Sequence, residues 1–284
     1  MAGNWDDWIG REIVQHDTLD PALAKRWLAT LDRETADESM PQGIHFCLCT
    51  PDAPTAKLGA DGHPARDASP GSFFPPIELP RRMWAASDIA FLSPIRVGAK
   101  IKRTSRISSI AEKEGKTGKL GFVEVEHSTL ADGADAIRET QTLVYRDAVA
   151  PDAPLTPPAP GEDRFDPDAW QTVETHAPDP SLLFRYSALT FNTHRIHYDL
   201  PYARDVERYR GLVVHGPLIA SLLLGLCARR FGENVLAKFS FRAVSPAIAD
   251  EPLHLALREG GTGLELGSFA SDGRQTLMAS ATLA

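Results

Sequence analysis

The sequence predicts an α+β protein built from two similar halves, each with a curved antiparallel sheet around a central helix. Three observations lead to this prediction. A proline-rich stretch divides the chain of 284 residues near its middle, similar strand-like segments and tight turns follow one another on both sides of it, and a helix-like segment precedes the strands of each half. A repeat of one supersecondary unit explains all three observations together.

The proline-rich stretch covers residues 147–167 and reads DAVAPDAPLTPPAPGEDRFDP. Proline at this density stiffens the chain and prevents both helix and sheet formation. We therefore expect an N-terminal domain over residues 1–147, a linker over 148–166 and a C-terminal domain over 167–284.

The same turn-forming residue pairs occur at equivalent places in the two halves. A Ser-Pro pair leads into the strands of each half, at Ser93 and Ser245, and an Asp-Gly pair separates the last two strand-like runs, at Asp132-Gly133 and Asp272-Gly273. Asp-Gly between alternating apolar runs is a strong signal for a β-hairpin. Each half is therefore expected to end in an antiparallel hairpin.

A helix is expected over residues 217–231 in the second half, and another over residues 21–32 in the first, where Asp20 provides an N-cap. The segment in the second half is almost wholly apolar as far as Leu226, and a helix that is apolar nearly all round is buried. A short buried helix wrapped by a curved antiparallel sheet is the arrangement of a hotdog domain. The expectation is a double hotdog, packed as a pseudo-dimer.

Composition excludes several classes of protein. Hydrophobic residues make up 43% and charged residues 24%, no apolar run approaches the ~18–20 residues of a membrane span, and the net charge of −8 disfavours nucleic acid as a partner. The start, MAGNWDDW, resembles neither a secretory nor a mitochondrial leader. The odd count of three cysteines favours reduced thiols, so we expect a cytoplasmic protein without a membrane partner.

One local basic cluster stands against the acidic balance, and it comprises Arg96, Lys100, Lys102, Arg103 and Arg106. It is interpreted either as a solvated strand face or as a contact for the phosphates of coenzyme A.

The densest polar cluster spans residues 186–199, YSALTFNTHRIHYD, and VVHGP follows at residues 213–217. This stretch resembles the active-site segment of the MaoC-like, or type 2, hydratases and dehydratases, which are hotdog enzymes. Together with LPRRMWA at residues 79–85 it is most similar to the branch of type 2 hydroxyacyl-thioester dehydratases that includes bacterial mesaconyl-C4-CoA (3-methylfumaryl-CoA) and itaconyl-CoA hydratases. The resemblance implies a hydro-lyase that hydrates an enoyl-CoA thioester, with a small branched dicarboxylyl-CoA as substrate and no cofactor or metal.

The resemblance also implies which residues are catalytic. His197 matches the family's catalytic histidine, Gly216 the glycine of its His-Gly pair, and Asn192 the position where the wider family has an aspartate. Because an amide can hydrogen-bond water but cannot take its proton, His197 alone is expected to transfer protons, while Asn192 positions the water.

The residues themselves suit this chemistry. Hydration of an enoyl thioester needs a held water, a base near neutrality and stabilisation of the enolate oxygen. The Gly216 N–H lies where the buried helix begins, with Pro217 as a suitable first-turn residue, so it is a candidate donor to the thioester oxygen.

Further residues are expected to assist. Supporting roles are predicted for His194, Tyr198, Asp199 and His215. Contacts with the substrate are predicted for Arg82, Trp84, Arg185 and Arg195, and with Arg81 these arginines are available for a free carboxylate.

Several alternatives stay open at this stage. His194, His197 and Asp199 could ligate a metal or be structural. The function could instead be a fatty-acid type 3-hydroxyacyl-thioester dehydratase, a thioesterase or a non-catalytic acyl-CoA-binding hotdog. The first half lacks the polar cluster, so it is expected to be non-catalytic and to accommodate substrate. A homodimer of double hotdogs is the expected assembly.

Overall fold

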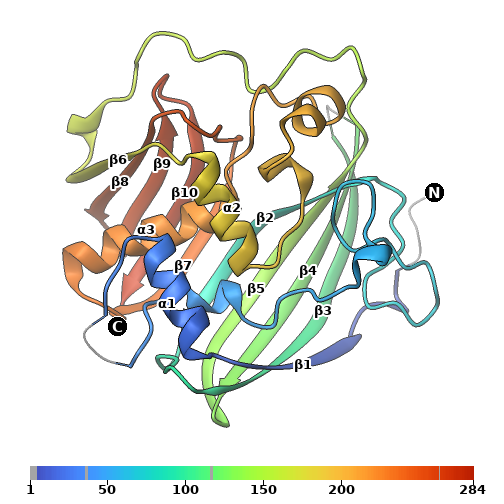
Figure 1. The fold of residues 1–284 in the computed structure, drawn as a ribbon, viewed down its shortest axis with the longest axis horizontal. Helices are drawn as coiled ribbons and strands as arrows, with labels where there is room; N and C mark the ends of the chain where they lie inside the picture. The colour runs from blue at the N-terminus through green and yellow to red at the C-terminus, as the bar shows by residue number, and fades with distance from the viewer. Residues whose placement is uncertain (1–4, 36–37, 116–117, 262) are drawn as a thin grey trace.

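A computed structural model describes residues 5–35, 38–115, 118–261 and 263–284. Its strands form one antiparallel sheet of ten, shown in Figure 1, in the order β1-β3-β4-β5-β2-β7-β10-β9-β8-β6. The strands of the first half are β1 (Glu12–Thr18), β2 (Arg81–Phe91), β3 (Lys100–Gly115), β4 (Gly118–Ala131) and β5 (Ala134–Arg146). Those of the second half are β6 (Thr172–His176), β7 (Leu236–Ala243), β8 (Leu253–Gly260), β9 (Gly263–Ala270) and β10 (Gln275–Leu283).

The order of the strands has an internal twofold pattern. Reading inward from either edge, β1-β3-β4-β5-β2 matches β6-β8-β9-β10-β7, and the two halves meet where β2 pairs with β7. Antiparallel pairing throughout, and the hairpin between β4 and β5, agree with the sequence. Asp132 and Gly133 both have positive φ, at 50° and 85°, as the tightest hairpin turns require. The predicted double hotdog is confirmed.

Three α-helices pack on one face of this sheet (Figure 1). Helix α1 (Pro21–Thr30) begins as predicted, with the Asp20 carboxylate accepting from the N–H groups of Ala22 and Leu23, but it ends at Thr30, before the expected residue 32. Helix α3 (Gly216–Phe231) is buried continuously from Leu218 to Cys227, as its apolar sequence predicts.

The second half contains a further helix, α2 (Pro180–Leu189), which the sequence analysis did not predict. Its apolar and polar residues alternate too irregularly over ten residues to give a clear helical period. In chain order α2 follows β6 as α1 follows β1, so α1 is the counterpart of α2. The position equivalent to α3 in the first half is held by the single 3₁₀ turn Ile44–Cys47, and this half therefore has a much shorter central helix.

The segment between β5 and β6 contains no α-helix or strand, and it runs over the upper edge of the molecule in Figure 1. It is held at Thr156, whose N–H donates to the Arg208 carbonyl at 2.7 Å and whose carbonyl accepts from the Arg210 N–H at 2.9 Å. The predicted linker is thus packed against the loop between α2 and α3. In the described part of the chain, no helix is long and apolar enough to cross a membrane.

Candidate active site

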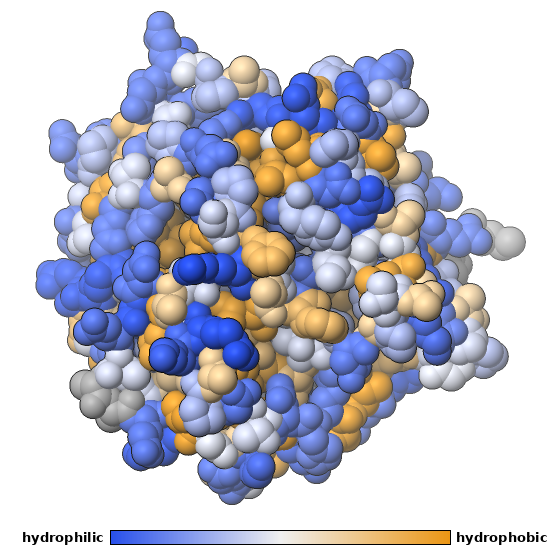
Figure 2. Space-filling view, in the orientation of Figure 1, coloured by the Kyte–Doolittle hydropathy of each residue, from blue (hydrophilic) through white to orange (hydrophobic). Residues whose placement is uncertain are grey.

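A cavity of about 1110 Å³ lies between the two halves and receives side chains from both. Figure 2 shows apolar side chains gathered at the centre of the face that carries the helices, with hydrophilic residues around them. Asn192, His194, His197, His215 and Gly216 all line the cavity. The structure thus brings together the polar residues of the loop and the start of α3, as the sequence analysis expected.

His197 ends a 3₁₀ turn, Arg195–His197, in the loop between α2 and α3. Its Nδ1–H donates to the carbonyl of Val213 at 2.7 Å, which leaves Nε2 as the free proton acceptor. Burial lowers the pKa of His197 to about 4, because desolvation outweighs the stabilising contact with Val213. The ring is therefore neutral at pH 7 and able to accept a proton.

His215 stacks on His197, with ring centroids 3.5 Å apart and planes 19° from parallel. It also bonds the hydroxyl of Ser187, on α2, through Nε2 at 2.8 Å. Burial holds the pKa of His215 well below its usual value. A neutral His215 therefore fixes the His197 ring between α2 and α3 without adding a positive charge.

Gly216 is the first residue of α3. No acceptor for its N–H is found among the described residues, and a Cβ at this position would have nothing within 4 Å. Open space beside an unpaired N–H, at the positive end of a helix of sixteen residues, suits a developing negative oxygen.

Asn192 has one amide atom already engaged, because its Oδ1 accepts from the backbone N–H of His194 at 2.9 Å. Its Nδ2 is the group left to face the cavity, and that group only donates. Asn192 can therefore hold an oxygen atom in place but offers no acceptor for a proton.

His194 is half-buried and lies between two other histidines. Its ring centroid lies 4.1 Å from that of His63 and 5.5 Å from that of His197. Desolvation, followed by the nearby His63, His197 and arginine charges, holds the pKa of His194 far below its usual value. The neutral His194 ring therefore lies between His63 and His197.

His63 comes from the first half, on a loop that clamps the second half. The Arg195 N–H donates to the Asp61 carbonyl at 2.9 Å, and the Thr193 hydroxyl to the Gly62 carbonyl at 2.5 Å. Gly62 has φ +88°, and a Cβ there would lie 1.8 Å from the Thr193 carbonyl oxygen. Only glycine fits this approach.

His63 bonds the Asp61 carboxylate through Nδ1 at 3.0 Å. Burial opposes ionisation of Asp61, but its hydrogen bonds and charge interaction with His63 prevail and lower its pKa. Sequence reasoning missed both residues, since a loop position carries no periodic signal and only the Asp61-Gly62-His63 triplet marked a tight turn.

Donor atoms of Asp61, His63 and His194 lie within 4.8 Å of one another. Two imidazoles on one tetrahedral zinc ion, with Zn–N near 2.1 Å, would have ring centroids about 5 Å apart. The His63 and His194 rings are closer, at 4.1 Å, and tilted by only 36°. This arrangement fits a hydrogen-bonded Asp61–His63 pair with the tilted His194 ring beside it better than a tetrahedral zinc site. The trio of His194, His197 and Asp199 considered from sequence is not assembled.

Asp199 and Arg195 pair with each other rather than lining the cavity. Asp199 Oδ2 accepts from Arg195 Nε and Nη2 at 2.9 and 2.7 Å, and Arg195 Nη1 donates to the Ala60 carbonyl. The Tyr198 hydroxyl donates to the Thr193 carbonyl at 3.1 Å. These residues hold the loop, and the substrate contact predicted for Arg195 is replaced by an internal ion pair.

The other residues predicted to contact substrate differ in whether they line the cavity and in whether another residue already binds them. Arg185 is exposed on α2 and does not line the cavity. Arg81 lines it but is engaged by Glu207 at 2.6 Å and the Tyr209 hydroxyl at 2.8 Å. Arg82 lines the cavity over the Phe74 ring and makes no hydrogen bond or ion pair within the described residues. Trp84 forms a wall, fixed by its Nε1 on Ser87.

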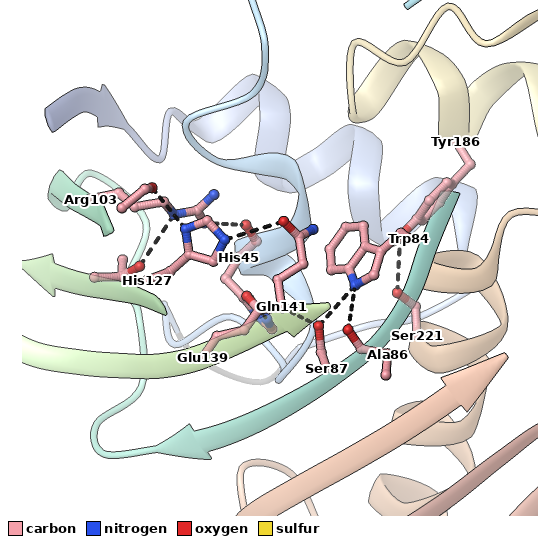
Figure 3. A network of polar contacts seen from close by, with 12 residues as sticks. His45, Trp84, Ala86, Ser87, Arg103, His127, Glu139, Gln141, Tyr186 and Ser221 are labelled. Carbon is pink, nitrogen blue, oxygen red and sulfur yellow. Dashed lines mark hydrogen bonds and ion pairs between the residues drawn. The ribbon is translucent and has the colours of Figure 1, made fainter. Parts of the chain in front are cut away.

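The five residues of the basic cluster do not all lie on the same face of the sheet. Arg96, Lys100, Lys102 and Arg106 are exposed, as in the solvated-face interpretation, whereas Arg103 turns into the cavity and donates to the His45 carbonyl at 2.9 Å. Figure 3 shows the buried polar network around it in the first half. Its other cavity-lining members are His45, His127, Glu139 and Gln141.

This network holds few full charges. Burial raises the pKa of Glu139, although Ser87 donates to it at 2.6 Å, and burial lowers the pKa of His127 to about 3. Neither ring nitrogen of His45 has a hydrogen-bond partner within the described chain. This part of the cavity wall is consequently polar with few full charges, unlike the apolar wall that a long alkyl chain would need.

Fold and site together define a double hotdog protein with a loop of histidines in the cavity between its halves. A conserved Mycobacterium tuberculosis protein described as having a double hotdog fold superposes with TM-score 0.58 at 14% identity, covering 97% of this chain and 96% of that one. HtdX of the same organism gives TM-score 0.69 at 18% identity, covering 96% of this chain and 100% of that one.

Sequence comparison gives the family. The profile of hydroxyacyl-thioester dehydratase type 2 matches residues 43–249. Mesaconyl-C(4)-CoA hydratase of Chloroflexus aurantiacus is 41% identical over 99% of both chains. The chain therefore belongs to the hydroxyacyl-thioester dehydratase type 2 family and is a hydro-lyase.

Proposed function

We propose that this protein reversibly hydrates the double bond of a small branched dicarboxylyl-CoA, such as mesaconyl-C4-CoA. The observation that carries the proposal is the meeting, in one cavity, of a neutral His197 with a free Nε2, the unpaired N–H of Gly216 and the unpaired guanidinium of Arg82. The name of the Chloroflexus relative supports the acyl group.

The geometry supports the following mechanism. The thioester carbonyl accepts from the Gly216 N–H, so the enolate charge develops at the start of α3. His197 Nε2 takes a proton from water as the water oxygen bonds the β-carbon, and Asn192 Nδ2–H holds that oxygen. A proton then returns to the α-carbon, which restores the thioester.

Arg82 fits the free carboxylate of such a substrate. In mesaconyl-C4-CoA this carboxylate is bonded to the β-carbon, the same carbon that receives water, so its binding group must lie near His197. The charge of Arg82 is one of those that lower the pKa of His194, the ring beside His197. Arg82 is thus the cation we assign to the carboxylate.

The first half is proposed to accommodate substrate and to have no hydratase loop of its own. Its 3₁₀ turn Ile44–Cys47 stands where the second half has a helix of sixteen residues, and its side chains line the cavity. The large cavity favours a second candidate, a fatty-acid type 3-hydroxyacyl-thioester dehydratase. The polar wall formed by Arg103, His127 and Glu139 favours a polar acyl group instead.

The proposal needs no cofactor or metal, since the coenzyme A is part of the substrate. A cytoplasmic location is supported by the three cysteines, all free and buried. A homodimer of double hotdogs is the assembly we propose, and size-exclusion chromatography with light scattering would measure it.

A substrate panel tests the function. The protein is incubated with crotonyl-CoA, mesaconyl-C4-CoA and a long-chain enoyl-CoA, while enoyl absorbance and free thiol are recorded. We expect absorbance to fall fastest with mesaconyl-C4-CoA and no thiol to appear. Faster reaction of the long chain supports the fatty-acid alternative, released thiol indicates a thioesterase, and no change with any substrate indicates a binding protein.

A further inference from the structure

His63 lines the cavity and is paired with Asp61 behind it, yet the mechanism above gives this pair no role. His63 lines the cavity next to His194, and its influence is among the causes that lower the pKa of His197. His63 comes from the first half of the chain, whereas His197, the residue that takes the proton of water, comes from the second. Its Nδ1 is held by Asp61, so Nε2 is the nitrogen left for a ligand.

The site also lacks a proton-transfer group at the expected place. Asn192 cannot exchange a proton, and its Oδ1 is already engaged by His194. His194 is held neutral by burial, and His215 is engaged by Ser187 and stacked behind His197. Among the described residues of the loop and of α3, this leaves His197 alone to receive the proton of water and return one to carbon.

We infer that His63, held by Asp61, is the second proton-transfer residue of the site and supplies from the first half what Asn192 cannot. This inference rests on the proposed hydratase function. It makes the catalytic site a joint product of both hotdogs.

An O–H bond of water breaks, its proton goes to His197 Nε2, and its oxygen bonds the β-carbon. The π electrons of the double bond move into the enolate, and a C–H bond forms at the α-carbon with the proton of His63 Nε2. His197 returns its proton to solvent and His63 regains one, so water is the only species added. Dehydration reverses each transfer.

The surroundings of His63 suit this role. The Asp61 carboxylate accepts from His63 Nδ1–H and fixes the ring, so that Nε2 is the nitrogen left to exchange a proton. The titratable and charged groups around the Asp61–His63 pair are His194 and His197 on the second-half loop, Arg81 and Arg82 on β2, and Arg66 on the loop that follows His63.

The inference is tested by asking whether a second substitution restores the kcat that a first substitution lowers. With mesaconyl-C4-CoA, His63→Gln should lower kcat about 10²-fold or more, in the range for a general acid, and Asp61→Asn should lower it less. Asn192→Asp restores a carboxylate to the site, so the double variant His63→Gln/Asn192→Asp should regain at least tenfold over His63→Gln. A structural role of His63 would give no such rescue. His16→Gln, at an exposed site on β1, is the matched control.

The pH profile of kcat gives a second readout, because removal of a general acid abolishes the alkaline limb that it produces. Circular dichroism and urea unfolding of each variant verify folding, and Asp61→Asn keeps the side-chain shape if His63→Gln does not fold. Turnover of His63→Gln within threefold of wild type, or loss without rescue and with an unchanged alkaline limb, overturns the inference. A wild-type protein that hydrates no enoyl-CoA overturns the proposed function instead.

Discussion

The Nδ1–H of His197 is held by the Val213 carbonyl, and its ring is stacked on His215, so the orientation of Nε2 is set before any substrate binds. Because this nitrogen takes the proton of water, His197→Ala should lower kcat for enoyl-CoA hydration by about 10²–10⁴-fold. Initial rates from the enoyl absorbance measure it, with circular dichroism to verify folding. Turnover close to wild type would exclude the mechanism.

Arg82 carries the proposed selectivity for a carboxylate. Loss of a charge-assisted hydrogen bond costs about 1.5–3 kcal/mol, so Arg82→Met should lower kcat/KM for mesaconyl-C4-CoA by roughly ten- to a hundredfold. Crotonyl-CoA has no carboxylate and should be affected little. Arg185→Met, at an exposed position on α2, is the matched control and should change neither value. Equal losses for both substrates would contradict the assignment.

At the scale of elements, one loop of the first half and one loop of the second fix each other. The closest approach is at Gly62, where a Cβ would overlap the Thr193 carbonyl, whereas Gly71, in the same irregular stretch, has nothing within 4 Å of its Cβ position. Gly62→Ala should therefore displace the His194–His197 segment, lowering kcat/KM at least tenfold and the free energy of unfolding by ~1–3 kcal/mol.

Gly71→Ala provides the matched control for that measurement and should leave both quantities near wild type. Turnover assays and urea unfolding of the two variants give the comparison. If Gly62→Ala behaves like Gly71→Ala, the clamp is not required for the site.

At the scale of the whole molecule, both halves bury neutral histidines. The five with lowered pKa are His45, His127, His194, His197 and His215. Near pH 6 the unfolded chain, with histidine pKa about 6.5, binds protons that the folded chain does not. The free energy of unfolding should therefore be highest above pH 7. Below pH 6.5 it should fall by up to ~1.4 kcal/mol per pH unit for each histidine, and for His197 this fall should continue to its folded pKa of about 4.

Urea unfolding between pH 7.5 and 5.5 measures this slope in a window where most carboxylates stay ionised. His127→Gln should flatten it, and His16→Gln, which removes an exposed histidine, should not. A free energy of unfolding that is independent of pH over this window would show that these rings accept protons within the fold.

Local signals account for what could be predicted from sequence. Ten consecutive buried residues in α3, Asp-Gly turns between strands and an N-cap before α1 each act within a few residues, so periodicity and turn chemistry identify them. The resemblance of the loop and of VVHGP to the active-site segment of type 2 hydratases located the cavity-lining residues Asn192, His197 and Gly216. Helix α2 was missed because its ten residues lack a clear period and its stability depends on packing against α1 and the core.

The sequence by itself determined the repeat, the buried helix and the histidine loop. Only the tertiary structure decided which charges face the cavity: Arg195 pairs with Asp199, Arg185 faces solvent, Arg82 is left unpaired, and the Asp61–His63 pair joins a loop more than a hundred residues away. The physical reason is that burial and pairing arise from contacts between segments distant in the chain. A charged residue looks the same in sequence whether the fold places it against a partner, in water or in a cavity.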